Sequence, residues 1–552
     1  MNRLVIASLA GVVLGTCASA LGEPGTGPAT SSSVVLRILP PEPARLEPAL
    51  TTAFLEPANE PDSGLPPSRG VDPPRPAAES VEPASEEASG EQEGQEVKEE
   101  ETKEKCDRAK MAKLEKQVIG SHKPLFYNND FSYLFDSCYH DCHLGDNLKR
   151  RCLGDWGVLD IGGQYRLRQH SERNIRGLGL TGRDDDFLLH RWRLYANTEI
   201  GSNLRFYAEM IDAQSNYEEF PPRLIEENRF DMLNLFADAR LYDGCRGDLW
   251  ARVGRQELLY GSQRLISPLD WANTRRTFEG GKLFWKGEDW DVDAFWVRPM
   301  QVRREEFDAP DQSQEFMGVY ATTKTWKDRT LDVYWLRYLE SDDTLTPRVV
   351  PFQIDTLGAR WQREIDNWLC EVEGGVQWGE YNHQDHEAGF FTVGGGRRLA
   401  DVQWKPVAWI YYDWASGDET LGNGFNHLFP LGHRYLGWMD IYGRRNIEDI
   451  NFLLTLEPTE RIKLSLWHHI FFLQDGDDVP YSVVMTPEAA APGGSQYLGQ
   501  ELDLALEWTM SPRTNLLLGY SHFFAGEFYD TNPTVPFSGD ADFFYTQYTV
   551  NF

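Results

Sequence analysis

The sequence predicts an all-β protein, an antiparallel transmembrane β-barrel of about 18 strands that follows a disordered N-terminal extension. Three observations predict this fold. Residues alternate in polarity along short segments, and short and long connections alternate between those segments. In addition, no stretch beyond the N-terminus holds the ~18–20 consecutive apolar residues that a membrane helix needs. Only helices and closed barrels satisfy every backbone group in lipid, so a chain of this kind that spans a membrane must form a barrel.

The first 20 residues predict a secretory signal peptide. A basic residue at Arg3 is followed by an apolar run at residues 4–14 and by an Ala-Ser-Ala site that ends at Ala20. A lipoprotein anchor at Cys17 is the alternative, but Thr16 stands where a small Gly, Ala or Ser is expected. We therefore expect cleavage after Ala20 and export of the chain.

Two further segments precede the predicted barrel. Residues 21–96 hold 14 of the 31 prolines and no Trp or Tyr, so they cannot bury enough apolar surface to offset the entropy of ordering. Residues 97–155 begin as a charged, helix-prone stretch and continue as a connector with several cysteines. All 18 tryptophans lie at or after Trp156. We therefore expect the barrel to occupy residues 156–552.

The alternation is clearest at the C-terminus. Phe544, Thr546, Tyr548 and Val550 share one face of a predicted strand, and the residues between them are polar or amphipathic. A strand of about ten residues that ends on an aromatic residue, here Phe552, is typical of the closing strand of an outer-membrane barrel. In such a barrel the apolar face contacts lipid and the polar face lines the lumen.

The turn signals of the barrel region fall into two classes. Tight turns are expected at residues 201–203, 243–247, 287–290, 326–330, 365–368, 404–407, 457–461 and 510–514. Longer connections are expected at residues 171–186, 214–231, 259–280, 299–315, 340–352, 380–395, 416–445, 472–497 and 524–542. This arrangement predicts 18 strands with both termini on the short-turn side. A soluble β-sandwich or propeller would also alternate in polarity, but it would not show this rhythm of connections.

The charge of the chain argues against a nucleic-acid partner, and the placement of its arginines favours an anionic solute. The formal net charge of −32 argues against nucleic acid, whose phosphates would be repelled. The inward faces of the predicted strands, and the connections next to them, nevertheless carry many arginines. The candidate pore-lining residues are Arg166, Arg168, Arg191, Arg193, Arg205, Arg240, Arg252, Arg255, Arg264, Arg275 and Arg276. A ring of arginines at a constriction would select anions and would match carboxylates in geometry.

A structural role is the alternative for these arginines. They could pair with nearby carboxylates in a neutral network that braces the barrel wall. The candidate partners are Asp160, Glu199, Glu209, Asp238 and Glu257.

Three runs of residues are specific enough to compare with a known family: GRQELLYGSQRL at 254–265, which continues to RRTFEG at 275–280, YDWASGD at 412–418 and GFNHLFP at 424–430. They resemble the bacterial alginate export family of outer-membrane proteins, and the first run is the most specific. The resemblance covers roughly residues 156–552. It implies a monomeric barrel of 18 strands with an electropositive, arginine-lined pathway for secretion of a polyuronate. By matching position it implies that Arg255, Arg264, Arg275 and Arg276 lie on the pathway or on loops folded into it.

The cysteines of the connector allow two interpretations. The run CYHDCH at 138–143 approximates a c-type haem attachment site through Cys138, Cys142 and His143, with three residues between the cysteines where two are usual. Alternatively, Cys106, Cys138, Cys142 and Cys152 form two disulfides in an oxidising compartment, and the sequence does not choose among the three possible pairings. We expect disulfides and no metal or other cofactor.

These observations together predict an outer-membrane channel that passes an anionic polysaccharide or smaller carboxylated solutes. The alternatives are a general or carbohydrate-uptake porin with structural arginines, and a haem-linked electron conduit. The expected partners are outer-membrane lipid, the anionic cargo and a periplasmic protein that contacts the N-terminal segment. Enzyme activity is not expected, because adjacent strand residues such as Ser521 and His522 point to opposite faces and cannot act as a pair.

Overall fold

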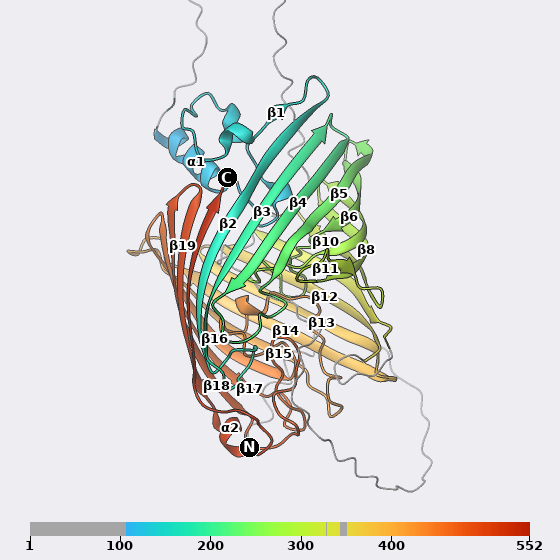
Figure 1. Ribbon diagram of the computed structural model, residues 1–552, viewed down its shortest axis with the longest axis vertical. Coiled ribbons are helices and arrows are strands. Elements are labelled where there is room, and N and C mark those ends of the chain that lie inside the picture. The colour runs from blue at the N-terminus through green and yellow to red at the C-terminus, as the bar shows by residue number, and fades with distance from the viewer. Residues whose placement is uncertain (1–105, 107, 327, 343–349) are drawn as a thin grey trace, which may run out of the picture. The chain divides into compact units, whose positions relative to one another are not determined.

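The computed structural model describes residues 106, 108–326, 328–342 and 350–552, and within them 18 antiparallel strands close into one barrel (Figure 1). The first and last of these strands, β2 (Gly157–Arg173) and β20 (Ala541–Asn551), pair with each other and so close the sheet. The predicted fold class and strand number are confirmed. The N-terminal extension up to residue 105, including the expected signal peptide, lies outside the described residues.

The remaining strands follow the chain around the barrel. They are β3 (Asp185–Ile200), β4 (Leu204–Asn216), β5 (Asn228–Gly244), β6 (Gly247–Gln256), β7 (Phe278–Gly287), β8 (Trp290–Gln301), β10 (Gln314–Thr323), β11 (Arg329–Glu340), β12 (Phe352–Ile365), β13 (Trp368–Tyr381), β14 (Gln384–Arg398), β15 (Val407–Ala415), β16 (Ile447–Thr459), β17 (Ile462–Phe472), β18 (Tyr497–Ser511) and β19 (Thr514–Ala525). Two short strands, β1 (Arg151–Cys152) and β9 (Ala309–Pro310), pair with β2 and β8.

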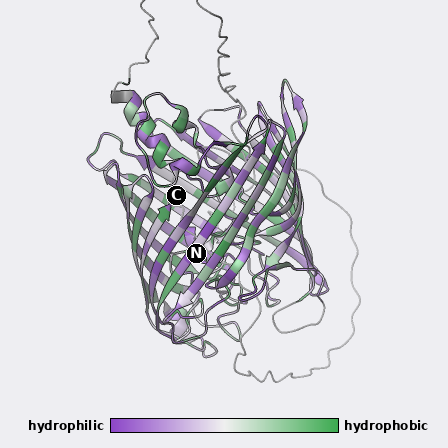
Figure 2. Ribbon diagram, turned by 45° about the horizontal axis from the view of Figure 1, so that its top comes forward, coloured by the Kyte–Doolittle hydropathy of each residue, from purple (hydrophilic) through white to green (hydrophobic). Residues whose placement is uncertain are grey.

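Strand β3 illustrates why these sequences form the wall of a membrane barrel. Trp192 and Leu194 point outward and are 45% and 50% exposed, whereas Arg191, Arg193 and Tyr195 point inward and are buried. Figure 2 shows the same alternation of hydrophobic and hydrophilic residues along the other barrel strands. In a bilayer the outward apolar side chains contact lipid, and closure of the sheet leaves no strand edge unpaired.

The two ends of the barrel differ in their connections. At one end the strands are joined by connections of two to eight residues. Helix α1 (Arg108–Ile119) and the C-terminus lie at this end, and α2 (Glu527–Thr531), in the last long connection, lies at the opposite end (Figure 1). Short connections are periplasmic in barrels of this type, so α1 lies on the periplasmic side.

One predicted long connection is wrong. Residues 380–395 were expected to form an external loop, but β13 and β14 are joined there by Asn382 and His383 alone. Both residues have positive φ, 50° and 62°, as the central pair of a type I′ hairpin turn requires. Strand β14 is rich in glycine and in charged residues, which hides its alternation.

Two of the long connections fold into the barrel and fill its interior. The β6–β7 loop (residues 257–277) and the β15–β16 loop (residues 416–446) are almost entirely buried from residues 262 and 422 onward. They contact each other through a parallel bridge between Ile266 and Phe429, where the Phe429 amide donates to the Leu265 carbonyl at 2.9 Å. Their apolar side chains form a core with inward residues of the wall, such as Phe316 and Phe471.

Residues 106 and 108–150 form a small capping unit at the periplasmic end. Its own core contains Leu114, Val118, Phe131 and Tyr133 beside Cys138. Helix α1 falls within the stretch predicted to be helical, and 3₁₀ turns follow it at Phe126–Asn128, Ser132–Phe135 and Asp146–Leu148. No helix of the described residues has the length and apolar character needed to cross a bilayer.

The capping unit contains one disulfide rather than the two expected. Cys106 is bonded to Cys138, whereas Cys142 and Cys152 are exposed thiols. Bonding to Cys106 uses the Cys138 thiol that the haem alternative would need together with Cys142 and His143. In the part of the chain that the structure describes, no group of three or more His, Cys, Asp or Glu side chains is arranged to hold a metal ion.

Candidate functional site

Six arginines point into the barrel from one continuous part of its wall, strands β2–β6. They are Arg166, Arg168, Arg191, Arg193, Arg205 and Arg252, each at most 2% exposed. They occupy inward positions of the alternating pattern, and the strand register sets Arg166 directly opposite Arg191. Like charges at opposite positions destabilise a sheet, so this pair requires compensation from elsewhere.

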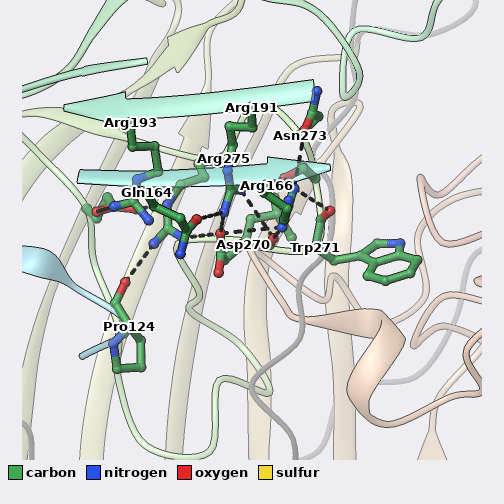
Figure 3. Close-up of polar contacts among 12 residues, drawn as sticks. Pro124, Gln164, Arg166, Arg191, Arg193, Asp270, Trp271, Asn273 and Arg275 are labelled. Atoms are coloured by element: carbon green, nitrogen blue, oxygen red, sulfur yellow. Dashed lines mark hydrogen bonds and ion pairs between the residues drawn. The ribbon is translucent and has the colours of Figure 1, made fainter. Parts of the chain in front are cut away.

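The compensation comes from Asp270 on the β6–β7 loop (Figure 3). Its carboxylate contacts the guanidinium group of Arg191, lies 2.5 Å from Arg275 Nη1, and lies 3.7 Å from Arg166 Nη1. Burial would raise the pKa of Asp270, but these guanidinium groups outweigh burial and hold the pKa well below its ordinary value. One carboxylate thus serves three arginines that come from two strands and a loop.

Backbone carbonyls of the same loop satisfy other donors of these arginines. Arg166 donates to the Asp270 carbonyl at 2.6 Å and to the Ala272 carbonyl at 2.7 Å, and Arg168 donates to the Trp271 carbonyl at 2.8 Å. Three further buried donors, Arg166 Nε, Arg168 Nη2 and Arg191 Nε, have no hydrogen-bond partner among the described residues. Carbonyls carry no net charge, so this part of the site remains positive.

Toward the periplasmic end the arginines pair with carboxylates of the wall. Arg193 Nε lies 2.6 Å from Glu209, and Asp238 bridges Arg205 at 2.5 Å and Arg252 at 2.7 Å. Arg275 also contacts Glu257.

We define the arginine cluster as Arg166, Arg168, Arg191, Arg193, Arg205, Arg252 and Arg275. Its seven guanidinium groups face four carboxylates, those of Glu209, Asp238, Glu257 and Asp270, so positive charge is in excess.

The structure does not bring the other four candidate arginines into this cluster. Arg264 lies on the β6–β7 loop but reaches β13, where it pairs with Glu371 and Glu373. Arg276 donates to backbone carbonyls of both inserted loops, and burial lowers its pKa to about 9.

The last two candidates lie on the wall outside the cluster. Arg255 pairs with Asp231 at 3.0 Å. Arg240 pairs with Asp243 at 3.1 Å beside the short turn that follows β5.

The lumen also has a second, acidic part that the sequence analysis did not single out. Asp449 on β16 and both Glu501 and Asp503 on β18 are fully buried inside the barrel. Asp449 is hydrogen-bonded to His469 at 2.8 Å, and Glu501 accepts from the Met439 amide of the β15–β16 loop at 2.8 Å. The period-two alternation of β16 and β18 could have identified these carboxylates, because they occupy the polar, inward positions of those strands.

Trp271 lies where the two inserted loops meet the arginine cluster. Its ring is covered on one side by Arg168, whose Cζ is 3.7 Å from the ring centroid, and stacks at 3.8 Å on His433 of the β15–β16 loop. The cavity beside Trp271, which Asp440 also lines, has a volume of about 20 Å³. That is room for about one water molecule. A solute larger than water therefore does not fit into this void beside Trp271.

Comparisons with known proteins agree with this architecture. A family described as alginate export matches residues 158–536. OccAB1 of Acinetobacter baumannii is 8% identical, with a TM-score of 0.51 over 73% of this chain and 99% of that chain. OpdO of Pseudomonas aeruginosa is 11% identical, with a TM-score of 0.50 over 71% of this chain and 97% of that chain. Such low identities show the fold alone, and no curated protein matches the sequence. The chain belongs to the alginate export family of outer-membrane β-barrel proteins.

Proposed function

We propose that the protein is a channel for an anionic polysaccharide of the alginate type, or for smaller carboxylated solutes, and that the arginine cluster is its selective constriction. The observation that carries this proposal is the position of Asp270, whose carboxylate is held by guanidinium groups of Arg166, Arg191 and Arg275 inside the lumen. Guanidinium matches carboxylate in shape and in charge, so a uronate carboxylate can take the same place.

Transport requires that cargo replace the groups of the inserted loop that now bind the arginine cluster. In the present arrangement, which we call closed, Asp270 and three loop carbonyls accept hydrogen bonds from the cluster. A cargo carboxylate can replace Asp270 at little electrostatic cost, because one anion takes the place of another. The unpaired donors Arg166 Nε, Arg168 Nη2 and Arg191 Nε then offer additional hydrogen bonds to cargo hydroxyl or carboxylate oxygens.

A general or carbohydrate-uptake porin is the second candidate function. It is favoured by the periplasmic part of the cluster, where Arg205 and Arg252 share Asp238 at 2.5 and 2.7 Å in a tightly paired and structural arrangement. Under this alternative the guanidinium groups brace the wall and the pore has no preference for anions.

Ion selectivity separates the two candidates. Purified protein in a planar bilayer with a salt gradient should give a reversal potential of anion-selective sign. Oligogalacturonate added to one side should block the current, whereas a neutral maltooligosaccharide of equal length should not. An unselective or cation-selective pore that oligogalacturonate does not block would contradict the proposed cargo and would leave the porin alternative.

A further inference from the structure

Residues 122–129 of the capping unit enter the barrel from its periplasmic end, and we call them the plug segment. The Phe126 ring packs against Tyr195 of β3 with centroids 5.6 Å apart. Tyr127 packs against Tyr207 of β4 at 5.5 Å and against Phe236 of β5 at 5.1 Å. All five side chains are buried in one apolar cluster. The three wall residues point into the lumen, so the segment occupies the mouth of the channel.

The plug segment also covers the arginine cluster. Arg193 Cζ lies 3.8 Å from the centroid of the Phe126 ring, and Arg252 Cζ lies 4.5 Å from that of Tyr127. Arg205 donates to the Tyr127 carbonyl at 2.8 Å, and Arg275 donates to the Pro124 carbonyl at 3.1 Å. The segment therefore contacts four of the seven guanidinium groups on their periplasmic side.

The groups of the plug segment that contact these arginines are all neutral. Residues 122–129 read HKPLFYNN and contain no carboxylate, so the segment meets the guanidinium groups with ring faces, peptide carbonyls and the Tyr127 hydroxyl, none of which is negatively charged. A carboxylate can accept two parallel hydrogen bonds from one guanidinium group and also brings the opposite charge, whereas a peptide carbonyl or a ring face does neither. A polyanion that arrives from the periplasm can therefore compete successfully for the same donors.

Both flanks of the plug segment are fixed to the rim of the barrel by one residue, Arg513, in the short turn between β18 and β19. Its guanidinium group donates to the Val118 carbonyl and to Ser121 Oγ, both at 3.1 Å, just before the segment. It also pairs at 2.8 Å with Asp146, which follows the segment. The segment can thus leave the lumen while the capping unit stays attached.

We propose that residues 122–129 are a tethered plug that closes the periplasmic mouth of the channel and that anionic cargo displaces. The identity of the displacing ligand rests on the proposed function, whereas closure of the mouth does not. The plug is a compact loop, because the Lys123 amide donates to Asn129 Oδ1 at 2.7 Å and the Asp130 amide donates to the Ser121 carbonyl at 2.9 Å. It can therefore move as a unit between the lumen and the periplasm.

Single-channel recording of the full chain tests closure. The variant F126A/Y127A removes the two rings that fill the mouth, and it should raise the mean conductance severalfold. F135A is the matched control, because Phe135 lies in the same capping unit but is 72% exposed, and its conductance should equal that of the unaltered protein. Heat-modifiable migration on a gel verifies that each barrel is folded. A folded F126A/Y127A barrel with unaltered conductance would overturn the plug.

Hydrogen exchange of the unaltered protein tests displacement independently. The amides of Lys123, Asn128, Asn129 and Asp130 are hydrogen-bonded within the loop, which Phe126 and Tyr127 hold against the wall in the closed arrangement, so they should be protected. A loop of this length that has left the lumen loses that packing, and its few hydrogen bonds then open readily. Oligogalacturonate should accelerate their exchange, and a maltooligosaccharide of equal length should not. Equal protection with and without oligogalacturonate, under conditions in which it blocks the current, would overturn displacement by cargo.

The two proposals can fail separately. If F126A/Y127A opens the pore but the open pore has no preference for anions, the plug is supported and the proposed cargo is not. If the pore is anion-selective but F126A/Y127A leaves the conductance unaltered, the proposed cargo is supported and the plug is overturned.

Discussion

Asp270 of the β6–β7 loop and Arg191 of strand β3 are joined as a carboxylate–guanidinium pair inside the barrel (Figure 3). The pair connects the inserted loop to the wall of the barrel. It also neutralises part of the charge that results from setting Arg166 opposite Arg191 in the register of β2 and β3. The same contact therefore holds the loop in the lumen and limits the positive charge there.

Replacing Asp270 with Asn should increase anion selectivity. The amide still accepts a hydrogen bond, but it removes one negative charge from the arginine cluster, so the reversal potential in a salt gradient should move further in the anion-selective direction. Asp243→Asn is a control of equal charge change, because Asp243 lies at the end of β5, beside a short turn, with its side chain 68% exposed. Equal shifts for both variants would indicate a general surface-charge effect and would argue against a role for Asp270.

The double variant in which Arg191 and Arg193 become Ala should lower anion selectivity. Both guanidinium groups are fully buried in the lumen wall, and their removal leaves the Asp270 and Glu209 carboxylates less compensated. The measurement is again the reversal potential, with Arg303→Ala as control because that arginine is half-exposed in an external loop and pairs only with exposed Glu306 among the described residues. An unaltered reversal potential in the double variant would place the selective constriction elsewhere.

The wall of the barrel could be predicted from sequence because its physical signal is local. Alternation with a period of two sets the side of each residue, as with Arg191 inward and Trp192 outward on β3. The same rule identified Glu209 and Asp238 as partners of inward arginines. It failed at Asn382 and His383, where a two-residue turn joins strands whose alternation is weak.

The constriction itself could not be predicted in this way. Asp270 lies in a loop without periodicity, and its contact with Arg191 depends on how 21 residues between β6 and β7 fold back into the lumen. The plug segment depends on a contact between Tyr127 and Glu257, which are 130 positions apart. Pairings at such a distance are set by the tertiary packing of the whole barrel and have no local pattern.

Loss of the disulfide should loosen the capping unit and leave the barrel intact. Cys106 and Cys138 are separated by 32 positions, and a crosslink over a loop of that length stabilises a fold by about 3–4 kcal/mol. In Cys138→Ser, trypsin should cleave within residues 106–150 faster than in the unaltered protein, while the barrel fragment stays resistant. Cys142→Ser is the control, because that thiol is exposed and unbonded. Equal cleavage rates in both variants would contradict a stabilising disulfide.

Glu488 should make the external end of the barrel less stable as pH rises. This residue lies in the β17–β18 loop beside Tyr529 of α2, and burial raises the pKa of its carboxyl to about 8. The folded state therefore binds a proton that the unfolded state releases near its ordinary pKa of 4.5. Its contribution to stability is fully present below pH 4.5 and is lost as pH rises to about 8.

The loss should be local and should depend on this one carboxyl. Hydrogen exchange, corrected for the intrinsic pH dependence of the rate, should show weaker protection of the Glu488 and Asn532 amides at pH 9 than at pH 6, since both are hydrogen-bonded next to the buried group. Glu488→Gln replaces the proton-bound carboxyl with a neutral amide that cannot ionise, so protection in this variant should be the same at both pH values. If the variant loses protection at pH 9 to the same extent as the unaltered protein, another group controls the opening, and the buried Glu488 carboxyl does not couple this loop to pH.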